Sequence, residues 1–370
     1  MQDTSKKPIR HTALYDLHKD MGAKFANFAD HDLPMNYRAG AIKEHLHTRA
    51  TSSLFDVSHM AQVSLIGKNV DREMERLVPS DLKSLSSGQM RYTMFTNASG
   101  GVLDDFIVTR VPGGMVLVLN ASQADQDLQY LKGSLSKDIA VERYHDYSLL
   151  ALQGPKSARF LARYISDIGG LRFMNSVSVL ISGIRAFVTR SGYTGEDGFE
   201  ISVENRHVEA LVRTLLREPE IALAGLASRD SLRLEAGLCL YGQDLTPSIS
   251  PVEANLSWTI SRRRLEEGGY PGDSIIRDQR VQGAKRRRIG VCLSTRSVPR
   301  AGMSILDSKG NTFGKVTSGG FAPNLQRSIA MGYIDSNDVQ KKCTISIEVR
   351  GRAHAGEIVS MPFIPHQYAK

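Results

Sequence analysis

The sequence predicts an α+β protein with a separate C-terminal β-barrel, and three features of the chain support this fold class. Residues 147–217 follow the order strand, helix, two strands, helix, which is typical of an α+β layer. Residues 286–370 hold short apolar runs separated by glycine and proline turns, as in a small barrel. A change of composition over 262–285 marks the main domain boundary in a chain of 370 residues. The expected barrel strands are Ile289–Leu293, Gly314–Thr317, Ser328–Ile334 and Thr344–Val349.

The composition is that of an ordinary soluble globular protein, with 41% hydrophobic and 23% charged residues. No apolar run is long enough to span a bilayer, and residues 1–10 lack the apolar stretch of a secretory signal. Three widely spaced cysteines, Cys239, Cys292 and Cys343, argue against a disulfide framework and favour a reducing compartment.

The net charge of +8 is partly concentrated in two basic runs, Arg262–Arg264 and Lys285–Arg288. A basic protein can bind nucleic acid, a membrane surface or an acidic protein, although such runs are most often only solvated faces. The chain has neither zinc-finger spacing nor an aromatic-rich basic motif. We therefore expect no nucleic-acid partner and no membrane partner.

The first 145 residues mix helices and strands. Glu44, His45 and His47 do not predict a metal site, because His-x-His on a helix points the two imidazoles apart. An irregular segment, rich in Asp, His and Pro, is expected over Phe28–Tyr37. The expected helices are Ala13–Ala26, Ala39–Arg49, Asn69–Leu77 and Gln123–Leu135, and the expected strands are Ala61–Leu65 and Met115–Leu119.

The most informative stretch is a predicted β-hairpin that carries two adjacent acids, Asp104 and Asp105. Its strands, Arg91–Thr96 and Val102–Thr109, are rich in β-branched and aromatic residues and flank a turn at 97–101. Strand side chains alternate faces, so the two acids point opposite ways, each among apolar neighbours. A buried carboxylate costs roughly several kcal/mol unless it is paired, hydrogen-bonded or faces a polar cavity. The plain alternative is that one acid caps a turn and the other meets an arginine.

A glycine-rich loop at 191–198 follows a strand that ends near Arg190. Upstream of it, a buried strand at 147–152 leads to Pro155, which is expected to begin a helix. The loop glycines run as Gly-x-x-Gly-x-x-Gly and precede a strand, so a dinucleotide-binding loop is excluded. In the following strand, Phe199–Val203, Glu200 points away from its apolar neighbours. Glu200 is either a ligand contact or a solvent-facing residue.

Residues 227–237 predict a helix with Ser228 at the N-cap and Gly237 at the end. Arg229 and Arg233 lie four apart on one face. Two such arginines usually form structural ion pairs, but the same pair can hold a ligand carboxylate.

Several blocks of the sequence resemble the T-protein family of the glycine cleavage system, in the family's order and over nearly the whole chain. Each block is modest alone, and together they are specific. The blocks are Leu-Phe-Asp-Val-Ser-His-Met at 54–60, Thr-Asn-Ala-Ser-Gly-Gly-Val-Leu-Asp-Asp at 96–105, Gly-Tyr-Thr-Gly-Glu-Asp-Gly-Phe-Glu at 192–200, Arg-Asp-Ser-Leu-Arg-Leu-Glu-Ala-Gly at 229–237, Ser-Pro-Val-Glu at 250–253 followed by Trp258, and Val-Thr-Ser-Gly at 316–319.

The resemblance implies an aminomethyltransferase of the glycine cleavage system. Such enzymes take an aminomethyl group from the lipoyl arm of H-protein and pass the one-carbon unit to the co-substrate tetrahydrofolate, releasing ammonia. The family fold is a three-domain cloverleaf around a central folate cavity. Here it implies one discontinuous α+β folate-binding domain at 1–50 and 145–270, a second α+β domain at 51–144 with the Asp104 hairpin, and a β-barrel domain at 285–370.

Carried over by motif, Asp104 is expected to be the catalytic acid next to the folate nitrogens, with Asp105 as structural support on the other face. Glu200 is expected to meet the guanidine-like edge of the pterin, a group that presents paired donors. The other residues expected to contact folate are Arg229, Tyr193, Asn120, Trp258, Met60 and Tyr368.

The implied partners are an acidic, lipoyl-bearing H-protein and the other glycine cleavage components. Opposite charge would raise the rate of association with the basic runs. The implied location is the bacterial cytoplasm, or the mitochondrial matrix in a eukaryote. One departure from the family is Asp30-His31, which follows Phe-Ala at 28–29 and places two ionisable groups in an early loop.

Three other functions are alternatives to the T-protein resemblance. The folate-binding iron–sulphur-assembly branch of the superfamily carries a Lys-Gly-Cys-Tyr-x-Gly-Gln-Glu motif, whereas residues 237–244 keep only its Cys-x-x-Gly-Gln-acid spacing. Cys239 is therefore expected to be a buried small residue. The folate domains of dimethylglycine and sarcosine oxidising enzymes are normally fused to a flavin domain, for which this chain has no room. A purely basic interaction protein explains none of the blocks.

Overall fold

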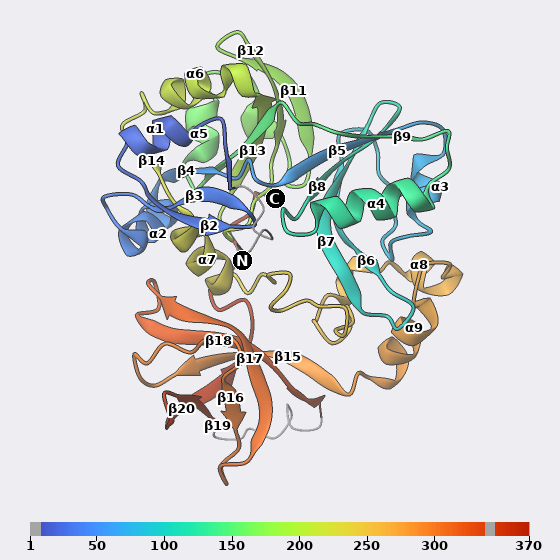
Figure 1. Ribbon diagram of the computed structural model, residues 1–370, viewed down its shortest axis with the longest axis vertical. Coiled ribbons are helices and arrows are strands. Elements are labelled where there is room, and N and C mark those ends of the chain that lie inside the picture. Colours follow the sequence, from blue (N-terminus) through green and yellow to red (C-terminus); the bar gives the residue numbers. More distant parts are fainter. Residues whose placement is uncertain (1–8, 337–344, 370) are drawn as a thin grey trace, which may run out of the picture.

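The computed structural model describes residues 9–336 and 345–369, which form three lobes that meet near the middle of the molecule (Figure 1). Two lobes are built on open β-sheets and the third is a barrel. Residues 1–8, which bear on the absence of a secretory signal, and Cys343, one of the three cysteines, lie outside the described residues.

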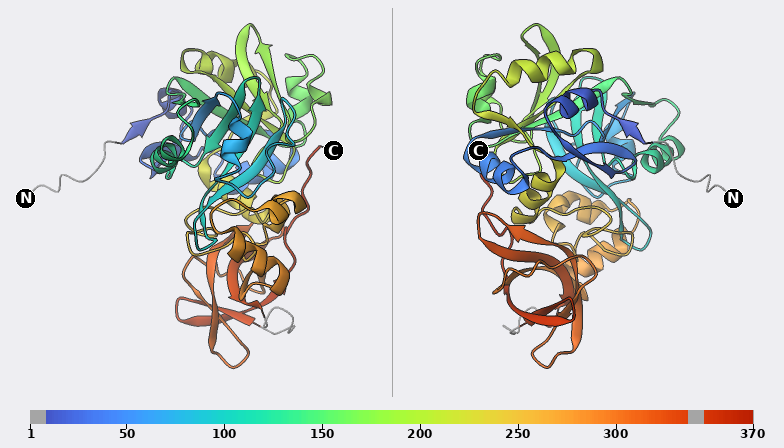
Figure 2. Two further views of the ribbon diagram at one scale, coloured as in Figure 1. Left: turned by 90° about the vertical axis from the view of Figure 1, so that its right-hand side faces the viewer. Right: turned by 60° about the vertical axis from the view of Figure 1, so that its left-hand side comes forward.

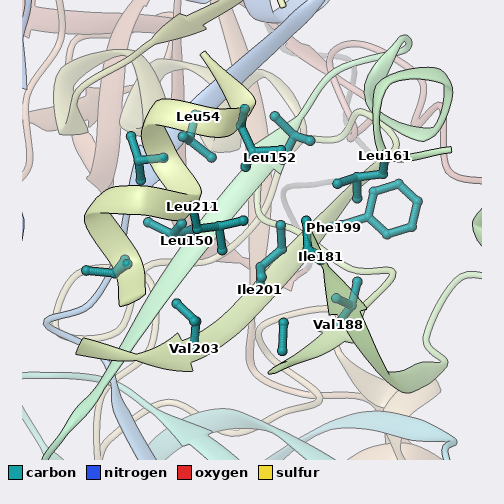
Figure 3. Packing of buried hydrophobic residues seen from close by; sticks show 14 of the residues in the cluster. Leu54, Leu150, Leu152, Leu161, Ile181, Val188, Phe199, Ile201, Val203 and Leu211 are labelled. Carbon is teal, nitrogen blue, oxygen red and sulfur yellow. The ribbon is translucent and has the colours of Figure 1, made fainter. Parts of the chain in front are cut away.

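The first lobe is built on a six-stranded sheet in the order β11-β12-β13-β10-β4-β14. Strand β10 is almost entirely buried because strands flank it and helices cover the sheet. Figure 3 shows Leu150, Ile201 and Leu211 among the side chains of this core, and each is fully buried. The elements are β4 (Ser52–Asp56), β10 (Tyr147–Gln153), α5 (Ser157–Leu161), η1 (Ile168–Gly170), β11 (Ser176–Ile181), β12 (Ile184–Thr189), β13 (Gly198–Glu204), α6 (Asn205–Leu215) and β14 (Ile221–Leu223).

The second lobe is a five-stranded sheet in the order β6-β7-β8-β5-β9, with the predicted hairpin as β6 and β7. In the turn, the Asn97 Oδ1 atom accepts hydrogen bonds from the amides of Ser99 (2.9 Å) and Gly101 (3.0 Å). A Cβ at Gly101 would lie 1.9 Å from the Pro247 carbonyl oxygen, so this position requires glycine. The elements are β5 (Ala61–Ile66), α3 (Val70–Met74), β6 (Met90–Thr96), β7 (Val102–Val111), β8 (Gly114–Leu119), α4 (Ala124–Ser134) and β9 (Ala140–Arg143).

The N-terminal segment differs from the prediction of one long helix followed by an irregular stretch. Helix α1 (Tyr15–Asp20) is short. It lies in the sequence between β1 (Arg10–His11) and the strands β2 (Lys24–Phe28) and β3 (His31–Asn36), and these three strands form one sheet. Ala29 and Asp30 have φ values of 49° and 60°. Two successive positive φ values make a tight hairpin turn, so Asp30 lies in the β2–β3 turn and His31 begins β3.

Helices α2 (Ala41–Ala50) and α7 (Leu226–Glu235) pack against each other beside this sheet, close to their predicted bounds. The predicted N-cap at Ser228 is wrong, because the helix begins at Leu226 and Ser228 lies inside its first turn. Gly237 ends the helix with φ +65°, as predicted. Pro155 likewise precedes α5 rather than beginning it.

The third lobe is a closed six-stranded barrel, seen end-on in the right-hand view of Figure 2. This confirms the barrel that the short strands of residues 286–370 predicted. Its strands are β15 (Arg286–Leu293), β16 (Ser304–Leu306), β17 (Thr312–Ala322), β18 (Arg327–Asp335), β19 (Ile345–Val349) and β20 (Arg352–Val359).

The first basic run does not form a free basic face, contrary to its treatment as a solvated patch. It begins α8 (Arg262–Glu267), in the connection that also holds η2 (Ser257–Thr259) and α9 (Asp273–Gln282). Arg263 bonds Glu75 (2.5 Å) and Asp81 (2.6 Å) in the second lobe. Arg264 is buried and donates to main-chain carbonyls. These arginines join the connection to the second lobe.

The second basic run has a similar structural use, since Arg288 is buried and donates to the carbonyls of Gly237 (2.9 Å) and Ala254 (3.0 Å). Arg286 pairs with Glu253 at 2.8 Å. Only part of the excess charge is therefore available to a partner. No helix within residues 9–336 and 345–369 is long and apolar enough to cross a membrane.

The pairing of β4 changes the expected boundary between the first two domains. Strand β4 pairs with β10 and β14, so Ser52–Asp56 belongs to the first lobe. We propose three domains as the sequence suggested, with the boundary near residue 51 moved to the C-terminal side of Asp56.

Candidate functional site

A cavity of about 1640 Å³ lies where the three lobes meet, and segments far apart in the sequence line it. Strand β7 contributes from the second lobe, β13 and α7 from the first, and the C-terminal tail closes one side. Of the residues predicted to contact folate, all line this cavity: Met60, Asn120, Tyr193, Glu200, Arg229, Trp258 and Tyr368.

Asp105, and not Asp104, is the acid of the hairpin that faces this cavity. Asp104 is fully buried on the opposite face of β7, beside the core residues Phe106 and Val108. The assignment of Asp104 as the acid at the cavity is therefore corrected. The prediction that the two acids point to opposite faces is correct. Because both faces of the strand are apolar, the sequence pattern could not show which face borders the cavity.

The hydrogen bonds of Asp105 hold its carboxyl group in place at the cavity wall. The Tyr92 hydroxyl donates to Asp105 Oδ2 at 2.8 Å, and the Asn120 amide donates to Oδ1 at 3.1 Å. Burial, with the negative charge of Asp104, raises the pKa of Asp105 to about 7, against the lowering effect of these two donors. Among the described residues, neither Asp104 nor Asp105 caps a turn or pairs with an arginine, so the plain alternative for the hairpin is wrong.

Behind Asp105, a second carboxyl group faces Asp104 from helix α4. Burial and the charge of Asp127 raise the pKa of Asp104, and burial raises the pKa of Asp127 as well. The Asn120 amide donates to Asp104 Oδ1 at 2.8 Å and so links Asp104 to Asp105. The cavity is thus bordered by a cluster of three acids, of which one is in contact with its interior.

Glu200 and Arg229 are two residues of opposite charge on the first-lobe wall of the cavity. The core-facing neighbours Phe199 and Ile201 are fully buried, which turns Glu200 toward the cavity. Glu200 Oε2 accepts a hydrogen bond from Ser191 at 3.1 Å. The guanidinium of Arg229 lies over the Tyr193 ring at 5.0 Å, and its buried Nη1 atom has no partner among the described residues. An unpaired buried donor at a cavity is a natural anchor for a ligand oxygen.

Arg233, the other arginine of α7, is structural. It is buried and pairs with Asp244 at 3.0 Å and Asp230 at 2.8 Å. Of the two readings of these arginines, the ion pair holds for Arg233, which also lines the cavity, whereas Arg229 keeps a buried donor without a partner among the described residues.

The glycine-rich loop before β13 owes its glycines to close packing. A Cβ at Gly192 would lie 1.9 Å from the Gln153 side chain, and one at Gly198 would lie 2.5 Å from it. Arg190 clamps the loop through a buried bidentate pair with Asp197, at 2.9 and 2.6 Å. This rigid loop fixes the direction of Glu200 and Tyr193.

The C-terminal tail lies against the same loop and brings Tyr368 to the cavity. The Gln367 amide donates to the Gly195 carbonyl at 2.8 Å, and His366 contacts the Ala236 carbonyl at 2.8 Å. Tyr368 stacks on Phe173 with ring centroids 4.1 Å apart. The cavity therefore has a flat aromatic wall made by the tail.

Sequence reasoning missed two further residues of the wall, Tyr92 and His59. Tyr92 pairs in register with Ile107, which makes it a diagonal neighbour of Asp105, so the hairpin register was the signal. Tyr92 also stacks on Trp258 at 5.9 Å, and this tryptophan is 69% exposed at the mouth of the cavity. Burial, with the charge of Arg229, lowers the pKa of His59 to about 3, so this imidazole is neutral.

Comparison with known proteins assigns the family. Residues 14–264 match the GCVT N-terminal domain, and residues 286–364 match the glycine cleavage T-protein C-terminal barrel domain. The chain is 40% identical to a mitochondrial aminomethyltransferase of Dictyostelium discoideum, over 99% of this chain and 95% of that protein. It is 42% identical to the mitochondrial aminomethyltransferase of Pisum sativum, over 99% of this chain and 92% of that protein.

The chain belongs to the glycine cleavage T-protein family.

A crystal structure agrees with this assignment. The glycine cleavage system aminomethyltransferase T of Bartonella henselae is 38% identical, has a TM-score of 0.92, and covers 98% of this chain and 100% of its own. The predicted α+β fold of three lobes with a C-terminal barrel is confirmed. As a T-protein, the chain is an enzyme of the aminomethyltransferase class.

The iron–sulphur-assembly reading is not favoured by these matches. Cys239 agrees with this, because burial raises the pKa of its thiol to about 12 and leaves it a poor nucleophile. It packs in an apolar cluster, as predicted for a small buried residue.

Proposed function

We propose that the central cavity binds tetrahydrofolate and receives the aminomethyl group that the lipoyl arm of H-protein carries. The observation that carries this proposal is the placement of Asp105 and Glu200 on facing lobes of one cavity. Glu200 offers a carboxylate for the guanidine-like edge of the pterin, and Arg229 offers an unpaired buried donor for a ligand oxygen. The aromatic rings of Tyr193, Trp258 and Tyr368 offer flat faces for the pterin and the benzoyl ring.

The transfer requires protons to move from the folate nitrogens to the leaving groups, and one acid that exchanges protons can carry them. The carbon of the aminomethyl group forms bonds to two folate nitrogens, and its bonds to sulphur and to nitrogen break. Each folate nitrogen loses one proton, and one proton is gained by the lipoyl sulphur and one by the leaving ammonia. Asp105, with a pKa of about 7, can accept a folate proton and return it to a leaving group.

Tyr92 and Asn120 serve this step as positioning residues. They donate to the two oxygens of Asp105 and so keep the carboxyl group turned toward the cavity. The same donors favour the ionised form, which is the form that accepts a proton.

The test is ammonia release from aminomethyl-loaded H-protein, measured with and without tetrahydrofolate. We expect rapid release and stoichiometric methylenetetrahydrofolate only when folate is present. Folate-independent release would contradict a folate cavity, and release without a folate product would contradict transfer of the carbon.

For location, the curated relatives above are named mitochondrial. For this chain we propose a reducing compartment, either a bacterial cytoplasm or a mitochondrial matrix, since Cys239 and Cys292 are free thiols. The other glycine cleavage components would be its working partners there.

A further inference from the structure

Two of the three acids beside the cavity have no contact with its interior, and the mechanism above leaves them without a task. Asp104 lies on the core side of β7 and is 0% exposed, and Asp127 on α4 is 5% exposed. Each carboxyl group acts on the pKa of the other, so the two side chains are close neighbours. The Oδ2 atom of each is buried and meets no donor among the described residues.

Two ionised carboxylates cannot form a hydrogen bond, because both are acceptors only. A pair in contact inside a protein therefore retains one proton, since two like charges at that distance do not both ionise. Asn120 donates to Asp104 Oδ1 (2.8 Å), so the remaining Asp104 oxygen is the one free to carry a proton toward Asp127.

We propose that Asp104 and Asp127 hold one proton between them, and that the remaining negative charge of this pair sets how strongly Asp105 holds its own proton. The proposal rests on Asp105 being the acid of the proposed function. Asp104 and Asp127 are then positioning residues, which act on the reaction through Asp105 and never touch the substrate.

The surroundings of Asp105 leave this pair as the main source of negative charge near it. A single charge a few ångströms away in a dry site moves a carboxyl pKa by about one unit or more. The groups that face Asp105 from the elements packed around it are Tyr92 on β6, Asp104 on β7, Asn120 after β8, Asp127 on α4, Tyr193 in the glycine-rich loop, and Cys239 and Tyr241 after α7.

The variants are chosen to separate charge from shape. Asp104→Asn imitates a protonated Asp104, because the amide can still donate to Asp127 and accept from Asn120. The double variant Asp104→Asn/Asp127→Asn keeps the volume and removes the charge of the pair. Asp125→Asn is the matched control, since it makes the same change on α4 at an exposed side chain that pairs with Arg143.

The first measurement is the pH profile of kcat/KM for tetrahydrofolate-dependent ammonia release. We expect the acid limb of Asp104→Asn and of Asp125→Asn to stay where it is in the unchanged enzyme, with a loss of less than about tenfold in kcat for Asp104→Asn. The limb of the double variant should move about one pH unit lower. A limb that stays in place in the folded double variant would overturn the proposal.

The second measurement is infrared spectroscopy of the full chain with carboxyl-labelled aspartate at about pH 8, where Asp105, with a pKa of about 7, is mostly ionised. We expect a carbonyl stretch of a protonated carboxylic acid that is absent in Asp104→Asn. An unchanged spectrum in that variant would show that Asp104 is ionised, and the proposal would fail whether or not the double variant folds. If the enzyme released no ammonia with folate, the proposed function would fail, while this spectrum would still decide whether the pair shares a proton.

Discussion

At Asp105, burial beside other acids raises a carboxyl pKa to about 7, and this brings proton exchange into the neutral range. The residue gains this property from its environment, because an exposed aspartate has a pKa near 4 and is a weak base. Arg229 shows the same dependence on place. It is one of two arginines on α7 that line the cavity, and of the two only Arg229 has a buried donor without a partner among the described residues.

The first prediction concerns the charge of Asp105. Because the ionised form accepts the proton, kcat/KM should fall about tenfold per pH unit below pH 7 and level off above it. Asp105→Asn should keep tetrahydrofolate affinity, since the amide has nearly the same shape, and should lose roughly 10²–10⁴-fold in kcat. Titration calorimetry and single-turnover ammonia release check the two halves. A variant that kept full turnover would remove Asp105 from the mechanism.

The second prediction concerns Glu200. Glu200→Ala should weaken tetrahydrofolate binding by roughly ten- to a hundredfold, because a charged hydrogen bond to the ligand is lost. Glu204→Ala is the control on the same strand, since Glu204 pairs with Arg206 near the surface and does not line the cavity. Equal affinity of the two variants in calorimetry would show that Glu200 does not contact folate.

At the scale of elements, the β6–β7 hairpin is the device that brings an acid to the cavity. Its turn is held by Asn97 and packs against the Pro247 carbonyl, where only a glycine fits. The register of the hairpin then places Tyr92 diagonally from Asp105 and supplies one of its two donors. A change in the turn should therefore affect the site as well as stability.

The third prediction compares two glycines of this lobe. Gly101→Ala should lower the free energy of unfolding by about 1–3 kcal/mol and reduce kcat, because its methyl group would displace the hairpin from Pro247. Gly133→Ala, at an exposed helical position of α4 with open space around it, should raise the free energy of unfolding by about 0.5–1 kcal/mol. Urea unfolding measures both. If Gly101→Ala raised the free energy of unfolding and Gly133→Ala lowered it, the close packing at the turn would not determine the stability of this lobe.

At the scale of the whole molecule, the cavity exists only because three lobes meet, and each supplies a different part of its wall. The sheet of the second lobe carries the acid, the first lobe carries Glu200 and Arg229, and the residues around the barrel close the mouth. Arg287 and Arg300 line the mouth and are exposed, and they donate hydrogen bonds to two neutral groups, the Asn255 side chain and the Gly319 carbonyl. We propose that their charge meets an acidic partner that delivers a group into the cavity.

The fourth prediction tests this docking surface. Arg287→Glu should raise the KM for H-protein about tenfold at low ionic strength, and the effect should shrink at high salt because exposed charges are screened. Arg262→Glu is the matched control, since Arg262 is also exposed but pairs with Glu266 on α8 and does not line the cavity. If both reversals raised KM alike, net charge and not the mouth would govern docking.

Much of the fold could be predicted from local pattern. The hairpin, the helix at Ala41–Ala50 and the barrel strands β15, β18 and β19 are close to their expected bounds, because their apolar periodicity and turn residues agree with the tertiary packing. Strand β17 is longer than predicted, and β16 and β20 were not predicted. The segment Lys24–Asn36 was misread as helix and loop. Its two strands are short and only partly buried, and their tight turn has no glycine or asparagine to signal it.

The blocks of sequence by themselves determined the family, the class of reaction and most of the residues around the cavity, because motif order and residue type are properties of the chain alone. Only the tertiary structure decided that Asp105 faces the cavity while Asp104 faces Asp127, and that most of the basic residues at 262–264 and 286–288 are used inside the molecule. Alternation along a strand separates two faces but does not show which face borders the cavity. A run of basic residues shows the sign of the charge but not the groups with which the residues pair. Both ambiguities are resolved by which element packs against each face.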